Sequence, residues 1–364
     1  MRSKMQNMSH ETKAIGLEAI EAQYTQFVGR RYIFLLALAF LTVALAGTAV
    51  TLGVIKLSIG QVYEVILHNF LPDQFQATEE AQRVVWNIRL PRILFGILAG
   101  MGLGIAGAVM QVVLKNPLAS PYTLGISSAA GFGAAVAILL GQGFFGSYLI
   151  AGNAFVFALI SSMVIVAIAR HKGATPEIMV LSGIAIMYFF SACTTLLEYF
   201  ADSDAVKGVV FWMVGSLSKA SWNELYVLCF VLAVCIPILV WKSWDFNVMS
   251  SGDETAKSLG IDVGRTRNLS MIISSLIVAS IVAFTGTIGF IGLVAPHIAR
   301  MIVGGDNKFV LPGSALVGGL LLAGADVVAQ HIMPPVILPI GVMTSFMGIP
   351  LFFCLIMRRR KGYW

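Results

Sequence analysis

The 364-residue chain is 58% hydrophobic and only 12% charged, whereas about a quarter of the residues of a typical soluble domain are charged. This composition excludes a soluble globular protein and indicates an all-α polytopic membrane protein surrounded by lipid. Sorting of Lys and Arg across the bilayer explains the net charge of +6 better than a nucleic-acid partner, and we expect no such partner.

The N-terminal 29 residues are polar, with a short candidate helix that ends before Arg30 and Arg31. No small-residue cleavage site follows the first apolar run, so we expect no cleavable signal peptide. We interpret residues 1–29 as a cytoplasmic tail that lies at the membrane interface, and 32–55 as the first membrane span.

The second span, residues 93–114, carries no charged residue. At about 1.5 Å per residue it is long enough to cross roughly 30 Å of hydrocarbon. Four glycines recur on it every three or four positions, at Gly96, Gly100, Gly104 and Gly107. Such spacing leaves one narrow helix face without side chains, and it predicts close packing against a neighbouring helix.

Eight more apolar runs follow. They lie at about 122–141, 149–169, 178–197, 225–241, two within 268–299 divided near Gly289, 309–329 and 340–357. Thr175 and Pro176 precede the fifth span in the order favoured for an N-cap and the first helical residue. We therefore expect ten spans in one transmembrane domain, residues 30–358, followed by a basic cytoplasmic tail, 359–364.

The largest polar insertion of the second half is the loop 243–267. Within it, residues 251–259 predict a short helix, which Gly260 ends in a left-handed cap. A helix in such a loop is either a solvated surface helix or a docking surface for a cytoplasmic partner.

Ten spans place both termini on one side, and 18 of the 24 Lys and Arg residues fall on that side. The positive-inside rule makes it the cytoplasmic side. Arg89 and Arg92 are exceptions, because they cluster at the outer start of the second span. Their side chains either extend to lipid headgroups or point outward to bind carboxylates of an external partner, and the spacing alone leaves both readings open.

The chain lacks three common nucleotide-binding and catalytic motifs. It has no phosphate-binding GxxxxGK[ST] loop, no HExxH and no GxSxG. Its cysteines, Cys193, Cys229, Cys235 and Cys354, form no CxxC pair, so we expect no metal site and no catalytic residue. Spans almost free of ionisable groups argue against transport driven by an ion gradient, and they favour an energy source on another polypeptide.

The chain contains a series of longer motifs: R-L-P-R at 89–92, G-x-x-M-Q at 107–111, N-P-L-A-x-P at 116–121, L-G-I-S at 124–127, T-G-x-I-G-F-I-G-L-V-x-P-H-I-x-R at 285–300, L-P-G at 311–313, A-D-V-V-A at 325–329 and L-P-I-G at 338–341. In this order, over about residues 56–357, they resemble the FecCD-like permease subunits of ABC importers for iron-siderophore, haem and cobalamin.

The resemblance implies a permease that is not itself an enzyme and binds no cofactor directly, with ATP on partner subunits. Implied partners are a second permease subunit, in a homodimer or pseudo-dimer, two cytoplasmic ATP-binding cassette subunits and an extracytoplasmic substrate-binding protein. The expected cargo is an iron(III)-siderophore complex carried across the cytoplasmic (inner) membrane. Cobalamin or haem is the alternative within the family, and an ion-gradient-driven secondary transporter is the alternative from another class.

The same resemblance assigns roles to residues. Arg89 and Arg92 would receive acidic residues of the binding protein, whereas Gln330 and His331 stand where relatives often have a further basic residue. The contact with the ATPases would involve Ser251, Gly252, Ala256, Leu259 and Gly260. The cytoplasmic gate would involve Ser127, Ser128, Thr175 and Pro176. From their small size, we expect Ser182, Gly183 and Ser191 to line the pathway.

Overall fold

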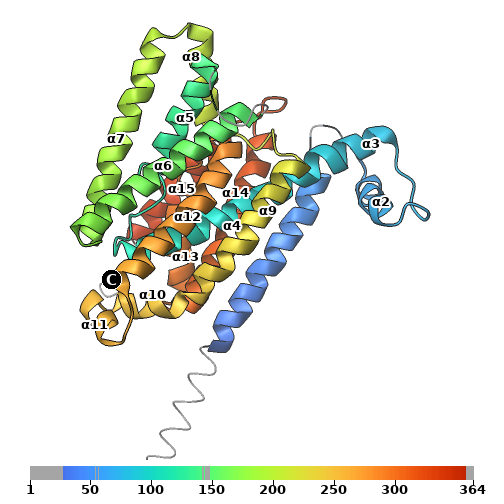
Figure 1. Cartoon of the computed structure of the whole chain (residues 1–364). Helices are drawn as coiled ribbons and strands as arrows, with labels where there is room; N and C mark the ends of the chain where they lie inside the picture. The colour runs from blue at the N-terminus through green and yellow to red at the C-terminus, as the bar shows by residue number, and fades with distance from the viewer. Residues whose placement is uncertain (1–27, 54, 56, 142, 144–147, 358–364) are drawn as a thin grey trace, which may run out of the picture.

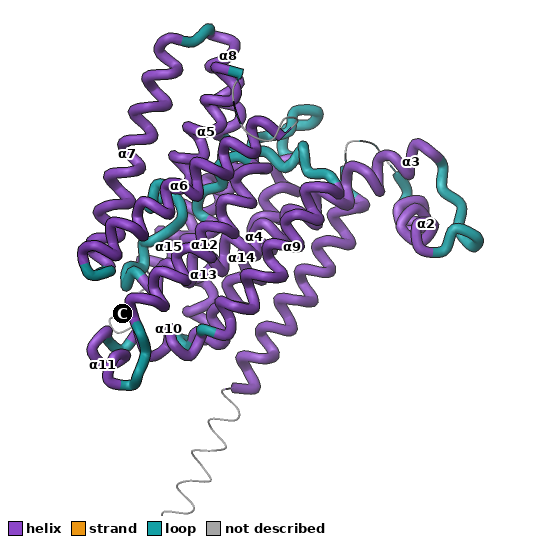
Figure 2. The backbone as a smooth tube through the Cα atoms, in the orientation of Figure 1, coloured by secondary structure: helices purple, strands orange, loops and turns teal. Residues whose placement is uncertain are grey.

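The computed structural model describes residues 28–357 except 54, 56, 142 and 144–147. Within this part of the chain every regular element is a helix, and most helices pack side by side in one bundle (Figures 1 and 2). The all-α fold is thus confirmed. The expected interfacial helix in 1–29 lies outside the described residues except for its last two, and so does the basic tail 359–364.

Seven described helices are long and apolar enough to cross a membrane. They are the N-terminal helix (Val28–Thr51), the continuous helix Glu79–Val113 that contains α4 (Leu90–Val113), α6 (Leu149–Lys172), α7 (Pro176–Phe200), α9 (Trp222–Trp241), α12 (Val263–Thr285) and α14 (Asn307–His331). Three shorter apolar helices accompany them, namely α5 (Ile126–Leu140), α13 (Ile291–Val303) and α15 (Ile340–Met357). Together they correspond to the ten spans that the sequence predicts.

Short helices in the polar segments are the main difference from the sequence-based expectation. They are α2 (Ile59–Phe70), α3 (Glu79–Val84), the π-helical turn η1 (Val85–Arg89), α8 (Ser203–Met213) and α10 (Ser243–Ser250). The turn η1 joins α3 to α4 directly before Pro91, whose missing N–H and bulky ring interrupt regular α-helical bonding. The N-terminal helix also ends at Thr51, four residues earlier than predicted.

The core of the bundle is α4, and its glycines face neighbouring backbone. A Cβ on Gly104 would lie 2.1 Å from the carbonyl oxygen of Ser314, and one on Gly100 would lie 2.2 Å from that of Gly318. Both contacts are with α14, whereas Gly107 makes an equally close contact with α13. The predicted close packing along this glycine face is confirmed, because α14 has room only where α4 has no side chain.

The two ends of the bundle differ. The α11 end carries α10, α11 (Asp253–Ser258), the turn between α6 and α7, and the start of the N-terminal helix, where Arg31 lies 3.4 Å from Asp306 of the α13–α14 turn. The α3 end carries α2, α3 and α8 (Figure 1). The chain alternates between these two ends, so the N-terminal helix begins and α15 finishes toward the α11 end.

Candidate functional site

The helix predicted in the polar loop exists, but it is shorter than expected. It begins at Asp253, after Ser251 has ended α10 and Gly252 has turned the chain at φ 127°. Gly260 follows it at φ 83°, which is the left-handed conformation that the sequence predicts. Together with α10, this helix forms a compact corner at the α11 end of the bundle.

This corner has one apolar side chain buried against the bundle and another that is exposed. Ala256 is fully buried and holds α11 against the bundle. Leu259, in contrast, is 65% exposed although it is large and apolar. Leu259 is thus a large apolar side chain on the surface of this corner.

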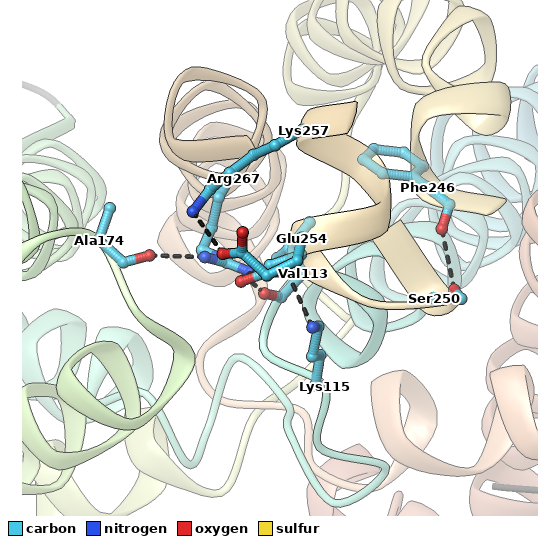
Figure 3. A network of polar contacts seen from close by, with 9 residues as sticks. Val113, Lys115, Ala174, Phe246, Ser250, Glu254, Lys257 and Arg267 are labelled. Atoms are coloured by element: carbon cyan, nitrogen blue, oxygen red, sulfur yellow. Dashed lines mark hydrogen bonds and ion pairs between the residues drawn. The ribbon is translucent and has the colours of Figure 1, made fainter. Parts of the chain in front are cut away.

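A buried guanidinium group ties this corner to the rest of the bundle. Arg267, at the start of α12, is 2% exposed. Its Nε donates to the carbonyl of Val113 (2.7 Å) and its Nη1 to the carbonyl of Ala174 (2.6 Å). Its Nη2 lies 3.0 and 3.1 Å from the two carboxylate oxygens of Asp253, and Lys115 Nζ is a second cation 2.8 Å from the same carboxylate (Figure 3). One side chain thus joins α4, α11 and the α6–α7 turn.

Asp253 is the acidic centre of this network. Partial burial by itself would raise its pKa, but hydrogen bonds from Lys115 and Arg267, together with their positive charges, bring the pKa below its ordinary value. The carboxylate is therefore ionised at neutral pH, and the charged hydrogen bonds are the stronger kind.

The expected gate residues do not come together. Thr175 caps α7, with its Oγ1 accepting from the Ile178 N–H at 3.5 Å, and Pro176 follows at the first helical position, both at the α11 end. Ser127 and Ser128 lie in the first turn of α5, where Ser127 lines a small cavity with the second half of α12. At about 1.5 Å per residue that is roughly 20 Å from the α11 end. The chain reaches this depth because residues 114–125 return into the bundle without forming a helix.

The expected pathway residues on α7 also differ from one another. Ser191 is exposed and Ser182 is partly exposed. Gly183 is buried, and a Cβ there would lie 3.0 Å from Cα of Leu124. Gly183 therefore packs against the returning segment and does not line an open surface, which corrects its assignment.

Arg89 turns inward at the α3 end. It is 8% exposed and donates to backbone carbonyls at the end of the N-terminal helix, 3.0 Å from Val50 O and 3.3 Å from Thr51 O, and to that of Ile55. All three acceptors are neutral.

Arg92 turns inward as well. It is 7% exposed, and it binds Asp326 of α14 through Nε at 2.9 Å and Nη2 at 2.7 Å. Gln330 donates to the same carboxylate at 2.8 Å, and Arg92 Nη1 donates to Ser218 at 3.2 Å. The expectation that both arginines point outward is wrong for this structure, because each side chain has found acceptors inside the chain.

Sequence reasoning missed four charged residues of these networks: Lys115, Asp253, Arg267 and Asp326. A signal existed for Asp326, since an acid within an apolar helix is expected to have a buried basic partner. No comparable signal marked Arg267, which stands at the edge of a polar loop. Among the described residues no cluster of His, Cys, Asp and Glu could hold a metal ion.

The similarity of this chain to known proteins extends over nearly its whole length. The FecCD transport family matches residues 36–358. A cobalamin import system permease of Halobacterium salinarum is 37% identical over 80% of this chain and 77% of its own length. An Fe(3+)-citrate import system permease of Bacillus subtilis is 37% identical over 88% of this chain and 95% of its own.

A solved structure is similar as well. It is described as an inward-facing conformation of a metal-chelate type ABC transporter, and it superposes with a TM-score of 0.79 at 30% sequence identity. The match covers 89% of this chain and 99% of the other.

Proposed function

Because this chain belongs to the FecCD transport family of ABC importer permeases, we propose that it carries an iron(III)-siderophore complex across the cytoplasmic membrane. The chain is a permease subunit and not an enzyme, since the ATPase of such an importer resides in separate subunits. Family membership also decides against the ion-gradient-driven alternative.

The cargo assignment rests on the relative that is named for import of Fe(3+)-citrate and matches over 88% of this chain. A relative named for cobalamin import has the same 37% identity. Cobalamin is therefore the second candidate, and haem is a third from the family at large. All three are bulky metal chelates, for which a pathway with few charged groups is suitable.

The proposed assembly contains a second permease subunit, two ATP-binding cassettes and an extracytoplasmic binding protein. Leu259 and the exposed side of α11 support a cassette contact at the α11 end, which the positive-inside rule makes cytoplasmic. The second permease is assigned to α7, which buries only a small share of its residues within this chain. Its exposed large residues include Leu181, Tyr188, Phe189, Leu196, Tyr199 and Phe200.

Docking of the binding protein is assigned to the α3 end, with Arg89 and Arg92 as the contacts. An incoming carboxylate must compete with Asp326 for Arg92, but only with neutral carbonyls for Arg89. A charged acceptor forms the stronger hydrogen bond, so Arg89 exchanges its partners more readily than Arg92 does.

Gating is assigned to the start of α7, where Thr175 and Pro176 lie beside the coupling corner. Ser127 and Ser128 form a second, deeper constriction, and Ser182 and Ser191 contribute to the wall of the pathway. Helix movement alternately opens the two ends.

Reconstitution tests the function. The permease, its cassettes and the binding protein are placed in proteoliposomes and offered a ferric hydroxamate siderophore, ferric citrate, cobalamin or haem. We expect ATP-dependent accumulation of the ferric siderophore, and none when the cassettes are left out and a proton gradient is applied instead. ATP-driven uptake of cobalamin alone would contradict the cargo assignment, and gradient-driven uptake by the permease alone would contradict the importer.

A further inference from the structure

We propose that Arg267 is the positioning residue that transmits movement of the cassette-bound helix α11 to the first turn of α7. This rests on the proposed function, because it assumes that a cassette moves α11. It adds a specific side chain through which that movement reaches the gate.

Arg267 binds acceptors from three separate segments of the chain. Its guanidinium lies between the Asp253 carboxylate, the Ala174 carbonyl and the Val113 carbonyl, all within 3.1 Å (Figure 3). The planar fork has donors in fixed directions, so the three acceptors keep their relative positions while it is in place. At 2% exposure water cannot replace these bonds, and losing one leaves a buried donor unpaired.

Two of the turns that Arg267 contacts have a strained backbone. Lys115 at φ 46° and Ala174 at φ 51° are two of the three non-glycine residues with positive φ in the described chain. Lys115 is two residues from Val113, whose carbonyl Arg267 binds, and Ala174 itself carries another of the bound carbonyls. Such conformations persist only where the surroundings enforce them, so both turns are held in place by the network.

Ala174 connects the Arg267 network to the start of α7. Ala174 directly precedes Thr175, which caps α7, and Pro176, whose ring fixes φ at the first helical position. This junction is short and stiff, so a displaced Ala174 carbonyl moves the start of α7. Since α7 is the least buried of the long helices, it can shift without repacking the core.

A coupling role and a merely structural clamp predict different results for Arg267→Lys. Lysine keeps the charge and can bind Asp253, but its single ammonium group lacks the fork that spans all three acceptors. We expect the variant to assemble with the cassettes and to hydrolyse ATP within about twofold of wild type, while the cargo transported per ATP falls at least tenfold. The matched control is Arg265→Lys, two residues away and exposed, which should change neither quantity.

A second measurement follows the movement itself. Spin labels at Glu177→Cys and Lys257→Cys, in a chain with its native cysteines replaced, report the distance between the start of α7 and α11. In the otherwise native complex this distance should stay constant between nucleotide-free and ATP-trapped states, and with Arg267→Lys it should change. If Arg267→Lys does not assemble, Asp253→Asn takes its place, because it removes the charge from α11 while keeping the shape of the side chain.

Three outcomes overturn the proposal: an unchanged ratio of transport to ATP hydrolysis, a label distance that is the same in variant and wild type, or a parallel loss of assembly, hydrolysis and transport in both Arg267→Lys and Asp253→Asn. Failure of the proposed function is distinguishable from these, since the wild-type complex would then show no ATP-linked transport at all.

Discussion

Arg89 and Arg92 are both buried at the α3 end of the bundle. Each binds acceptors within the chain, backbone carbonyls in the case of Arg89 and Asp326 in the case of Arg92. A cation at a place poor in water lowers its free energy by pairing, and α14 offers Asp326 within reach of α4. The pair at Arg92 is therefore structural in this conformation, whatever it binds during transport.

Removing one member of this pair should destabilise the permease strongly. Arg92→Met leaves Asp326 as a buried unpaired acid, and Asp326→Leu leaves the opposite charge, so we expect each to cost about 3–5 kcal/mol. The double variant should recover most of this loss, because it leaves no charge behind. Thermal unfolding in detergent measures all three.

The double variant also separates stability from docking. A folded Arg92→Met/Asp326→Leu permease that no longer captures the loaded binding protein supports the docking assignment, and unchanged capture contradicts it for Arg92. Additive destabilisation in the double variant would mean that the pair is not what joins α4 to α14.

Among the elements, α4 decides how closely the bundle can pack. Its glycine face allows the backbone of α14 to approach, while the short helices α2, α3, α8 and α10 lie at the ends of the bundle (Figure 1). Small residues give close van der Waals contact between helices where the hydrophobic effect contributes little. The element is thus sensitive to any added volume on one face only.

Gly104→Ala should therefore be disruptive. Its Cβ would lie 2.1 Å from the Ser314 carbonyl oxygen, which belongs to backbone and cannot rotate away. We expect a loss of at least about 3 kcal/mol, the upper part of the range for overpacking. The measurement is the unfolding midpoint in detergent.

Gly324→Ala on α14 is the matched control, since nothing lies within 4 Å of its added Cβ. It should be neutral or stabilise the protein by up to about 1 kcal/mol, as expected for alanine in a helix. Equal effects of the two substitutions would show that the close contact at Gly104 is not decisive.

At the scale of the whole molecule, the chain passes back and forth between a basic end and an end with few basic residues. Among the described residues, the α11 end carries most of the Lys and Arg, which predicts that it faces the cytoplasm. One exposed lysine lies at each end of the bundle: Lys207 of α8 is 68% exposed and Lys257 of α11 is 59% exposed. Each forms an ion pair with an acidic residue three positions earlier in the chain.

Labelling at these two positions tests the orientation. In spheroplasts, with the native cysteines replaced, a membrane-impermeant maleimide should label Lys207→Cys and should label Lys257→Cys only after the membrane is permeabilised. The reverse pattern would place the α11 end outside and would invalidate the cassette contact.

Residue types and their spacing were enough to predict the ten apolar segments, the cap at Thr175, the glycine face of α4 and the helix closed by Gly260. These features depend on local quantities, namely the thickness of hydrocarbon that a helix must cross, the φ values that a residue allows and the volume of a side chain. Family motifs added the role of the chain as a permease.

Packing of the helices set which groups meet. It placed Asp326 beside Arg92, brought Val113, Ala174 and Asp253 to Arg267, turned Gly183 toward Leu124 and separated Ser127 from Thr175. The partners of a buried charge are set by residues distant in the chain, and a non-helical return such as 114–125 changes depth without any local sign. A bilayer imposes the length of each span, but only packing between spans decides what each side chain touches.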